Sequence, residues 1–286
     1  MLRAMKRTKL QIAAVQMKFR PTIPENVEQI TESIHSAARA GADVILFPEC
    51  AVTGYRRDFT GLTPGPVNQG CADVARAARE ARCNVLVGAP TFRNRRWFNS
   101  LLVFDRRGRT VFEYSKIHRA PWDRQFFQPG NSLAFFRIDG VSATAIICHE
   151  RRYPELVRLP VMQGARIVFH PNAGLDTLRV SRTKRRGRDG IAARACENQV
   201  YYVFANSVGP QGNGLWSAGD SKMVAPDSRV LALANNRDET VIQAELDLAD
   251  AGRKYARDAL QYPVFLRSAW KQVLALCKRQ LKKSSE

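Results

Sequence analysis

The sequence predicts an α/β protein. Strand-like apolar runs alternate with helix-like segments along its 286 residues, and this alternation is typical of the α/β class. Two pairs of strands are joined by short turns of the hairpin kind, so some strands run antiparallel to their neighbours. The pattern leaves two arrangements open: a doubly wound parallel sheet, or two sheets packed face to face with helices outside.

The first third of the chain contains three predicted strands and two predicted helices. The strands are short apolar runs, and Pro48 stops the second of them. Gly41 directly follows the first helix, where glycine is a common C-cap. The predicted strands are residues 10–17, 43–47 and 84–89, and the predicted helices are residues 25–40 and 68–82.

The remaining elements continue the alternation. One hairpin joins residues 98–105 to residues 110–114 across a charged turn, and another turns at Asp139-Gly140, a two-residue turn signal. Gly164 ends a predicted helix after the second hairpin. The second hairpin comprises 133–138 and 141–147, the helices are 153–163 and 190–198, and the later strands are 165–170, 200–206, 222–225, 230–233 and 240–246.

No linker, repeat or low-complexity segment divides the chain, so we expect a single domain over residues 1–286. From about residue 249 the chain is basic and partly amphipathic, and we expect this tail to pack against the body of the protein or against another subunit. No segment approaches the roughly 18 uninterrupted apolar residues of a membrane helix. The basic N-terminus lacks the apolar core of a signal peptide. These features favour a cytoplasmic protein without a membrane partner.

The chain is strongly basic, with 45 Lys and Arg against 26 Asp and Glu and a formal net charge of +19. Such a charge attracts polyanions, and its densest stretch is residues 182–188. No recognised nucleic-acid motif surrounds that stretch, so we favour a solvated basic surface over a specific nucleic-acid site. The six cysteines form no CxxC pair and no Cys/His cluster at zinc spacing, so no metal site is predicted.

Three residues that lie just beyond predicted strands carry the chemistry. They are Glu49, Lys116 and Cys148, and α/β folds place their sites at such strand ends. A carboxylate can take the proton of a thiol and return it to a leaving amine. An ammonium group lowers the pKa of a thiol and stabilises an oxyanion. The three residues are therefore a candidate base, electrophilic helper and nucleophile for attack on a carbonyl or nitrile carbon.

Seven short stretches, in this order along the chain, resemble the nitrilase superfamily of carbon–nitrogen hydrolases. They are residues 46–49 (LFPE), 114–118 (YSKIH), 126–130 (FFQPG), 148–155 (CHERRYPE), 193–199 (ARACENQ), 205–209 (ANSVG) and 219–221 (GDS). The resemblance implies a four-layer αββα sandwich of two mixed β-sheets flanked by helices. It also implies no metal or organic cofactor, and a homodimer or larger homo-oligomer.

The same resemblance implies roles for individual residues. Glu49 is expected to be the general base, Lys116 to stabilise the tetrahedral intermediate, and Cys148 to be the nucleophile. The backbone N–H of His149 is expected to be an oxyanion donor. Many members carry a second glutamate shortly before the Phe-x-Pro-Gly stretch, and here Asp123 stands at that position, where it would hold the lysine or the substrate amine.

The arginines after the nucleophile point to a class of substrate. Cys-x-Glu-Arg-Arg-aromatic-Pro-Glu is similar to the N-carbamoyl amino acid amidohydrolase branch, in which an arginine pair helps to receive a carboxylate. Arg151 and Arg152 are expected to do so here, although they could equally pair with Glu150 and Glu155 in a structural network. One histidine of that branch is replaced by Pro121.

Asn172 ends a predicted strand on the expected side of the site, where it lines the pocket or forms a turn. We therefore expect cysteine-dependent hydrolysis of a small linear amide or N-carbamoyl compound through a thioester, with release of ammonia or an amine. Acyl transfer to an amine and a non-catalytic basic binding module are the alternatives.

Overall fold

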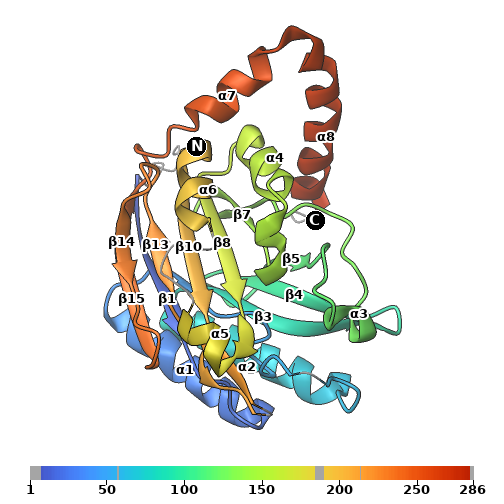
Figure 1. Ribbon diagram of the computed structural model, residues 1–286, viewed down its shortest axis with the longest axis vertical. Coiled ribbons are helices and arrows are strands. Elements are labelled where there is room, and N and C mark those ends of the chain that lie inside the picture. Colours follow the sequence, from blue (N-terminus) through green and yellow to red (C-terminus); the bar gives the residue numbers. More distant parts are fainter. Residues whose placement is uncertain (1–7, 57, 184–189, 213, 284–286) are drawn as a thin grey trace.

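The computed structural model describes residues 8–56, 58–183, 190–212 and 214–283, with side chains as far as residue 275. From residue 184 onward, the basic stretch 182–188 lies outside the described residues. Two six-stranded mixed sheets lie face to face, and helices cover the outer face of each sheet (Figure 1). Of the two arrangements that the strand and helix pattern had left open, the structure has the second: two sheets packed face to face with helices outside.

The first sheet has the strand order β15-β1-β2-β3-β4-β5. Strands β1, β2 and β3 run parallel, while β15, β4 and β5 pair antiparallel with their neighbours. The β4–β5 pairing confirms the first predicted hairpin. The strands are β1 (Lys9–Gln16), β2 (Val44–Leu46), β3 (Asn84–Arg93), β4 (Arg96–Phe104), β5 (Thr110–Ser115) and β15 (Thr240–Asp247).

The second sheet has the order β14-β13-β10-β8-β7-β6. Its central strands β10, β8 and β7 run parallel, and the antiparallel β6–β7 pair confirms the second predicted hairpin. The strands are β6 (Phe136–Ile138), β7 (Val141–Ala145), β8 (Ile167–Asn172), β10 (Tyr201–Asn206), β13 (Lys222–Val224) and β14 (Val230–Leu233).

Alternate residues of the central strands face different layers. In β1, Leu10, Ile12 and Ala14 pack between the sheets, whereas Ala13 and Val15 pack under the first helical layer. Successive side chains of a strand point to opposite faces, so a strand between two layers must be apolar on both. This is why the central strands are near-continuous apolar runs.

Helices α1 (Ile23–Arg39) and α2 (Pro64–Ala81) pack together on the outer face of the first sheet. Helix α1 begins with a capping box of Thr22 and Glu25, and buries Ile30 and Ile34 on its inner face.

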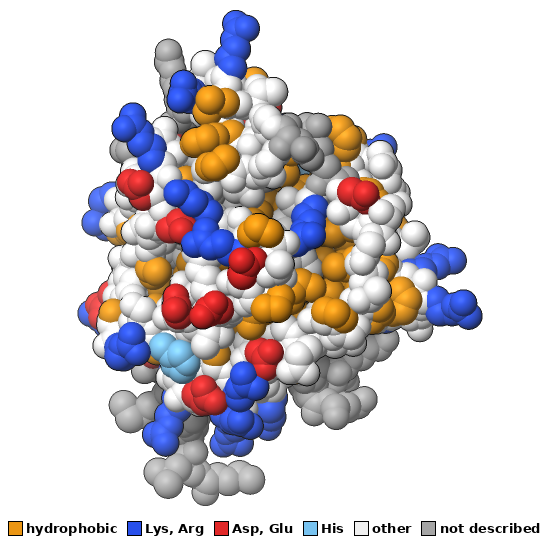
Figure 2. Space-filling model, turned by 90° about the horizontal axis from the view of Figure 1, so that it is seen from below, with side chains coloured by type: hydrophobic (Ala, Val, Ile, Leu, Met, Phe, Trp, Pro, Cys, Tyr) orange, Lys and Arg blue, Asp and Glu red, His pale blue; other side chains and the backbone are white. Residues whose placement is uncertain are grey.

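On the face of the molecule that is seen from below Figure 1, basic side chains are spread out, with acidic ones among them (Figure 2).

The outer face of the second sheet is covered by α4 (Glu155–Gln163) and α6 (Ile191–Asn198). The tail forms α7 (Lys254–Gln261), η2 (Val264–Leu266) and α8 (Arg267–Lys283), which project beyond the sandwich while α8 packs on α4 (Figure 1). The helices of the described residues include none with the length and apolar character needed to cross a membrane.

Several short elements were not predicted. They are α3 (Asp123–Phe126), α5 (Leu178–Thr183), the 3-10 helix η1 (Cys148–Arg152), and a small sheet of β9 (Leu175–Thr177), β11 (Val208–Pro210) and β12 (Leu215–Ala218). The three strands of this small sheet, LDT, VGP and LWSA, contain no uninterrupted apolar run that would indicate a strand. The β3–β4 hairpin was also missed, because its turn residues Asn94 and Arg95 adopt positive φ without the usual glycine.

Candidate active site

Strand ends from both sheets bring the predicted triad together. Glu49 lies three residues beyond β2, and Lys116 directly follows β5, both in the first sheet. Cys148 lies three residues beyond β7 in the second sheet, so the strand there is two residues shorter than predicted. The site therefore lies between the two sheets, where an end of the first sheet meets an end of the second.

Lys116 is held between two carboxylates. Its Nζ lies 2.6 Å from Oε1 of Glu49 and 2.7 Å from Oδ2 of Asp123, and none of the three side chains is exposed to solvent. Asn99 donates a hydrogen bond of 2.8 Å to the same oxygen of Glu49. The other oxygen, Oε2, is buried and has no hydrogen-bond partner among the described residues. That oxygen is free to accept a proton.

The charges of this cluster act on Cys148. Burial raises the pKa of its thiol to about 12, Glu49 adds to the rise, and Lys116 and Arg151 oppose it. Burial also raises the pKa of Glu49, while Lys116 opposes that rise. Burial alone would lower the pKa of Lys116, but the surrounding acidic groups, Glu49 first, raise it well above its usual value. The resting thiol is therefore protonated, and a nucleophilic attack needs a base beside it.

Cys148 sits at a sharp backbone turn and stays partly exposed to solvent. Its φ is +49°, in the left-handed region that costs a non-glycine residue energy. Nε2 of the buried His170 lies 3.2 Å from the Cys148 carbonyl oxygen, and the Tyr202 hydroxyl lies 2.9 Å from Nδ1. Because burial lowers the pKa of His170 to about 3, its ring is neutral. One ring nitrogen can then donate to the carbonyl while the other accepts from the tyrosine.

Two glycines let the backbone pack closely beneath the site. A Cβ at Gly88 would lie 2.4 Å from the Pro48 carbonyl oxygen and 2.7 Å from the Glu49 Cα. A Cβ at Gly130 would lie only 1.9 Å from the Ser115 carbonyl oxygen. Gly130 also donates a backbone hydrogen bond of 2.8 Å to the carbonyl of Lys116. The Phe-Phe-Gln-Pro-Gly stretch therefore supports the segment that carries the lysine.

Asp123 and Asn172, two of the predicted substrate contacts, are buried. Besides its ion pair, Asp123 accepts hydrogen bonds from the Tyr55 hydroxyl at 2.7 Å and from the Ala120 N–H at 3.0 Å, so both of its oxygens are engaged by the protein. Asn172 ends β8 and donates 2.8 Å to Oδ1 of Asn206, while its own Oδ1 has no partner in the described part of the chain. Asp123 thus holds the lysine, whereas the Oδ1 atom of Asn172 could accept a hydrogen bond from a substrate.

The other predicted contacts lie on η1. His149 and Arg151 are half-buried, and Arg152 is exposed with its guanidinium 3.2 Å from Nδ1 of His149. Arg151 is close enough to influence the pKa of Cys148, whereas Arg152 contacts a neighbour on the surface. Neither arginine pairs with Glu150 in the described structure. The predicted structural network is therefore not formed through that carboxylate.

The model of the carbon–nitrogen hydrolase family matches residues 11–255. This chain belongs to that family. Among its relatives, the 2-oxoglutaramate amidase of Bacillus subtilis (strain 168) is 28% identical, over 84% of this chain and 90% of the relative. The (R)-stereoselective amidase of a Pseudomonas sp. is 30% identical, over 80% of this chain and 82% of the relative. The prediction of a carbon–nitrogen hydrolase is confirmed.

The fold of this carbon–nitrogen hydrolase matches solved structures. A mutant of the Nesterenkonia AN1 amidase from the nitrilase superfamily superposes with a TM-score of 0.78 at 23% identity, over 92% of this chain and 98% of that one. This similarity confirms the predicted sandwich of two mixed sheets flanked by helices.

Sequence reasoning missed the residues that support the triad of this carbon–nitrogen hydrolase. Tyr55, Asn99, Tyr114 and His170 each donate to or contact a predicted catalytic segment across long stretches of chain. One signal was available: Asn99 is a polar residue within a mostly apolar strand. A buried amide in that setting needs a partner, and its partner is Glu49.

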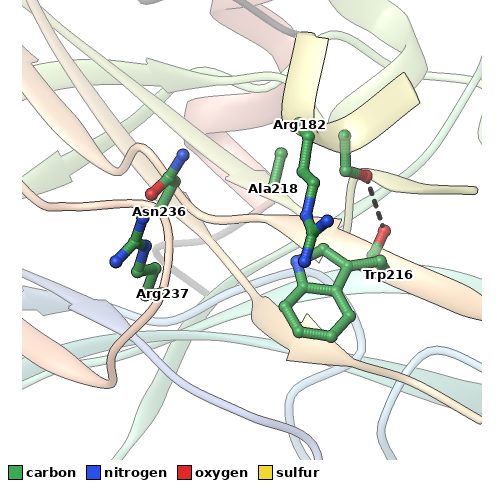
Figure 3. A pocket seen from close by; sticks show the side chains of 6 residues that line it. Arg182, Trp216, Ala218, Asn236 and Arg237 are labelled. Carbon is green, nitrogen blue, oxygen red and sulfur yellow. Dashed lines mark hydrogen bonds between the residues drawn. The ribbon is translucent and has the colours of Figure 1, made fainter. Parts of the chain in front are cut away.

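A separate hollow of about 460 Å³ lies at β12 and α5 and is lined by Arg182, Trp216, Asn236 and Arg237 (Figure 3). It contains none of the predicted site residues of the hydrolase. The described residues hold no group of three or more His, Cys, Asp or Glu side chains placed to bind a metal ion.

Proposed function

We propose that this carbon–nitrogen hydrolase cleaves a small linear amide or N-carbamoyl compound through a thioester at Cys148. The observation that carries the proposal is the buried Lys116 ammonium, fixed between Glu49 and Asp123 beside the thiol. That arrangement supports the proposal that a base, a positive charge and a nucleophile act together in one site.

The chemistry follows from these positions. As the Cys148 sulfur bonds to the carbonyl carbon, its proton passes to Glu49, whose Oε2 lacks another partner in the described structure. Lys116 and the His149 N–H, in the first turn of η1 where helix N–H groups lack intrahelical partners, would stabilise the oxyanion. Glu49 then gives the proton to the leaving nitrogen as the C–N bond breaks. Water attacks the thioester and gives a proton to Glu49, the C–S bond breaks, Glu49 passes the proton to the departing Cys148 thiolate, and the acid is released.

The names of the relatives support the choice of an amide. The Bacillus protein is a 2-oxoglutaramate amidase and the Pseudomonas protein is an (R)-stereoselective amidase. Arg151 supports a substrate that bears a carboxylate, because it is half-buried near the thiol and has no ion-pair partner among the described residues. A guanidinium suits a carboxylate because both are planar and can form two parallel hydrogen bonds.

Ammonia release across a panel of aliphatic amides, N-carbamoyl amino acids and nitriles tests the activity. We expect Cys148→Ala to abolish turnover and to lose the iodoacetamide adduct while the fold is kept. Cys196→Ala, at an exposed cysteine on α6, is the matched control and should leave turnover unchanged. Undiminished hydrolysis by Cys148→Ala would refute the proposal. Product formed only when an amine is added would indicate acyl transfer instead.

The substrate class is tested with the two neighbouring arginines. Arg151→Gln should raise KM for N-carbamoyl amino acids much more than KM for neutral amides, because only the former carry a carboxylate. Arg152→Gln is the control, since Arg152 is exposed and contacts His149. Equal effects of both variants, or an equal effect of Arg151→Gln on neutral amides, would contradict the carboxylate contact.

We also infer that the protein forms a homo-oligomer through its C-terminal segment. Large apolar side chains are exposed there: Tyr255 at 51%, Tyr262 at 66%, Val264 at 61% and Phe265 at 80%. A cluster of this kind typically marks an interaction surface. Light scattering should give a mass above that of one chain for the wild type and a smaller mass for Phe265→Ser. A monomeric wild type would refute this inference.

A further inference from the structure

One buried carboxylate outside the triad contacts the segments on both sides of the site. Glu150 is fully buried. Its Oε1 accepts hydrogen bonds from the backbone N–H of Ile117 at 2.6 Å and of His118 at 3.2 Å. Its Oε2 accepts from the backbone N–H of Ile147 at 2.7 Å. The Tyr114 hydroxyl contacts both oxygens, at 2.9 and 3.0 Å.

The donors lie next to Lys116 and Cys148 in the chain. Tyr114, Ile117 and His118 flank Lys116 on both sides, at the end of a strand of the first sheet. Ile147 directly precedes Cys148, at the end of a strand of the second sheet. The side chain of Glu150 therefore joins the lysine segment to the nucleophile segment across the boundary between the two sheets.

This junction matters because the sheets contribute different parts of the site. Lys116 and Glu49 follow strands of the first sheet, and their partner Asp123 lies on α3, which contacts β4 of that sheet, whereas Cys148 follows a strand of the second sheet. A small slip of one sheet end past the other would alter the distance from the sulfur to the ammonium. In catalysis, a misplacement of about 1 Å can cost on the order of a hundredfold in rate.

We propose that Glu150 is a positioning residue that sets Lys116 against Cys148 by binding the backbone on both sides of the site. The inference rests on the proposed function, because the two positioned groups are the nucleophile and the group that stabilises the intermediate. Within the described structure, Glu150 makes hydrogen bonds to backbone N–H groups and to the Tyr114 hydroxyl, and none to the Cys148 sulfur or the Lys116 ammonium.

The chemistry of the cluster requires a carboxylate rather than any other group of the same shape. All four partners are donors, and an ionised carboxylate only accepts. In Glu150→Gln, the amide NH₂ would face either the Ile147 N–H or the N–H groups beside Lys116. One of the two segments would then lose its anchor while the shape of the side chain is kept.

The experiment compares kcat, KM and the unfolding temperature of the full chain in four forms. These are the wild type, Glu150→Gln, Tyr114→Phe and, as matched control, Glu155→Gln, the same change at an exposed position in the first turn of α4. We expect kcat of Glu150→Gln to fall by about a hundredfold, with KM changed by less than about threefold because no substrate contact is lost. Tyr114→Phe should lower kcat less, since the three backbone hydrogen bonds remain. Glu155→Gln should behave as the wild type.

The outcomes separate positioning from a contribution to stability alone. If the folded fraction of Glu150→Gln keeps its kcat while the unfolding temperature falls, Glu150 is only a structural residue and the inference is overturned. If Glu150→Gln does not fold, Tyr114→Phe decides: an unchanged kcat in that variant overturns the inference. A wild type without Cys148-dependent amide hydrolysis would instead refute the proposed function, so the two failures are distinguishable.

Discussion

Replacing Lys116 by Met should destabilise the protein by several kcal/mol. Methionine keeps the length of an apolar stem but removes the charge. Glu49 and Asp123 would then be two fully buried carboxylates without their common cation, which now lies 2.6 and 2.7 Å from them. Removal of one partner of a buried ion pair costs about 3–5 kcal/mol. Solvent does not screen these charges and so does not reduce this free-energy cost, because all three side chains are unexposed.

The deficit is measurable by thermal unfolding followed by circular dichroism. For a large domain, each kcal/mol shifts Tm by about 2–4 °C, so the variant should melt about 6–20 °C below the wild type at pH 8. Burial already raises the pKa of Glu49, and Lys116 opposes that rise, so the variant should raise it further. A carboxyl group whose pKa is higher in the folded state loses its favourable contribution as the pH rises. The deficit should therefore be smaller at pH 5 than at pH 8.

A double variant isolates the charge. Lys116→Met combined with Asp123→Asn removes one of the two carboxylates and should recover part of the lost Tm, provided that charge and not packing is the cause. A Lys116→Met protein that melts with the wild type at pH 8 would refute the reasoning. A deficit of the same size at pH 5 and pH 8 would show that the destabilisation comes from packing, because lost packing does not titrate.

Three further predictions concern the surroundings of the triad. Glu49→Gln should lower kcat by about 10²–10⁴-fold. In the wild type, activity should be lost at low pH, beginning above the usual glutamate pKa, and the variant should lack this loss. A variant with the same pH profile of kcat/KM as the wild type would exclude Glu49 as the base. Gly130→Ala should lower both Tm and ammonia release, because its Cβ would overlap a backbone oxygen, whereas Gly61→Ala, with open space around it, should do neither. Tyr55→Phe should cost about 1.5–3 kcal/mol in urea unfolding through the lost hydrogen bond to the buried Asp123 carboxylate, and no change in the midpoint would contradict that contact.

The strands and the large helices could be predicted because each buries a recognisable apolar pattern. The runs at β1 and β10 are apolar on both faces since they lie between two layers. The number of sheets could not be derived from this pattern, because a strand covered on both sides looks the same in either arrangement. Only the resemblance to a family supplied the sandwich.

The proximity of Glu49, Lys116 and Cys148 could be predicted because reactive side chains lie just beyond apolar runs. The supporting contacts could not, because most of them depend on backbone groups or on residues far apart in the chain. Glu150 binds N–H groups that every residue possesses, so its sequence neighbourhood gives no hint of its partners. Asp123 was expected to contact lysine or substrate, and only the structure reveals Tyr55 on its other oxygen.

The left-handed backbone at Cys148 has a consequence for the history of this position. Its φ of +49° is strained for any residue with a Cβ, at a cost of roughly 1–2 kcal/mol, and glycine would relieve the strain while ending the chemistry. Selection for folding stability alone would therefore favour the replacement of Cys148 by glycine. A descendant that no longer needed turnover should drift towards glycine here and become harder to unfold.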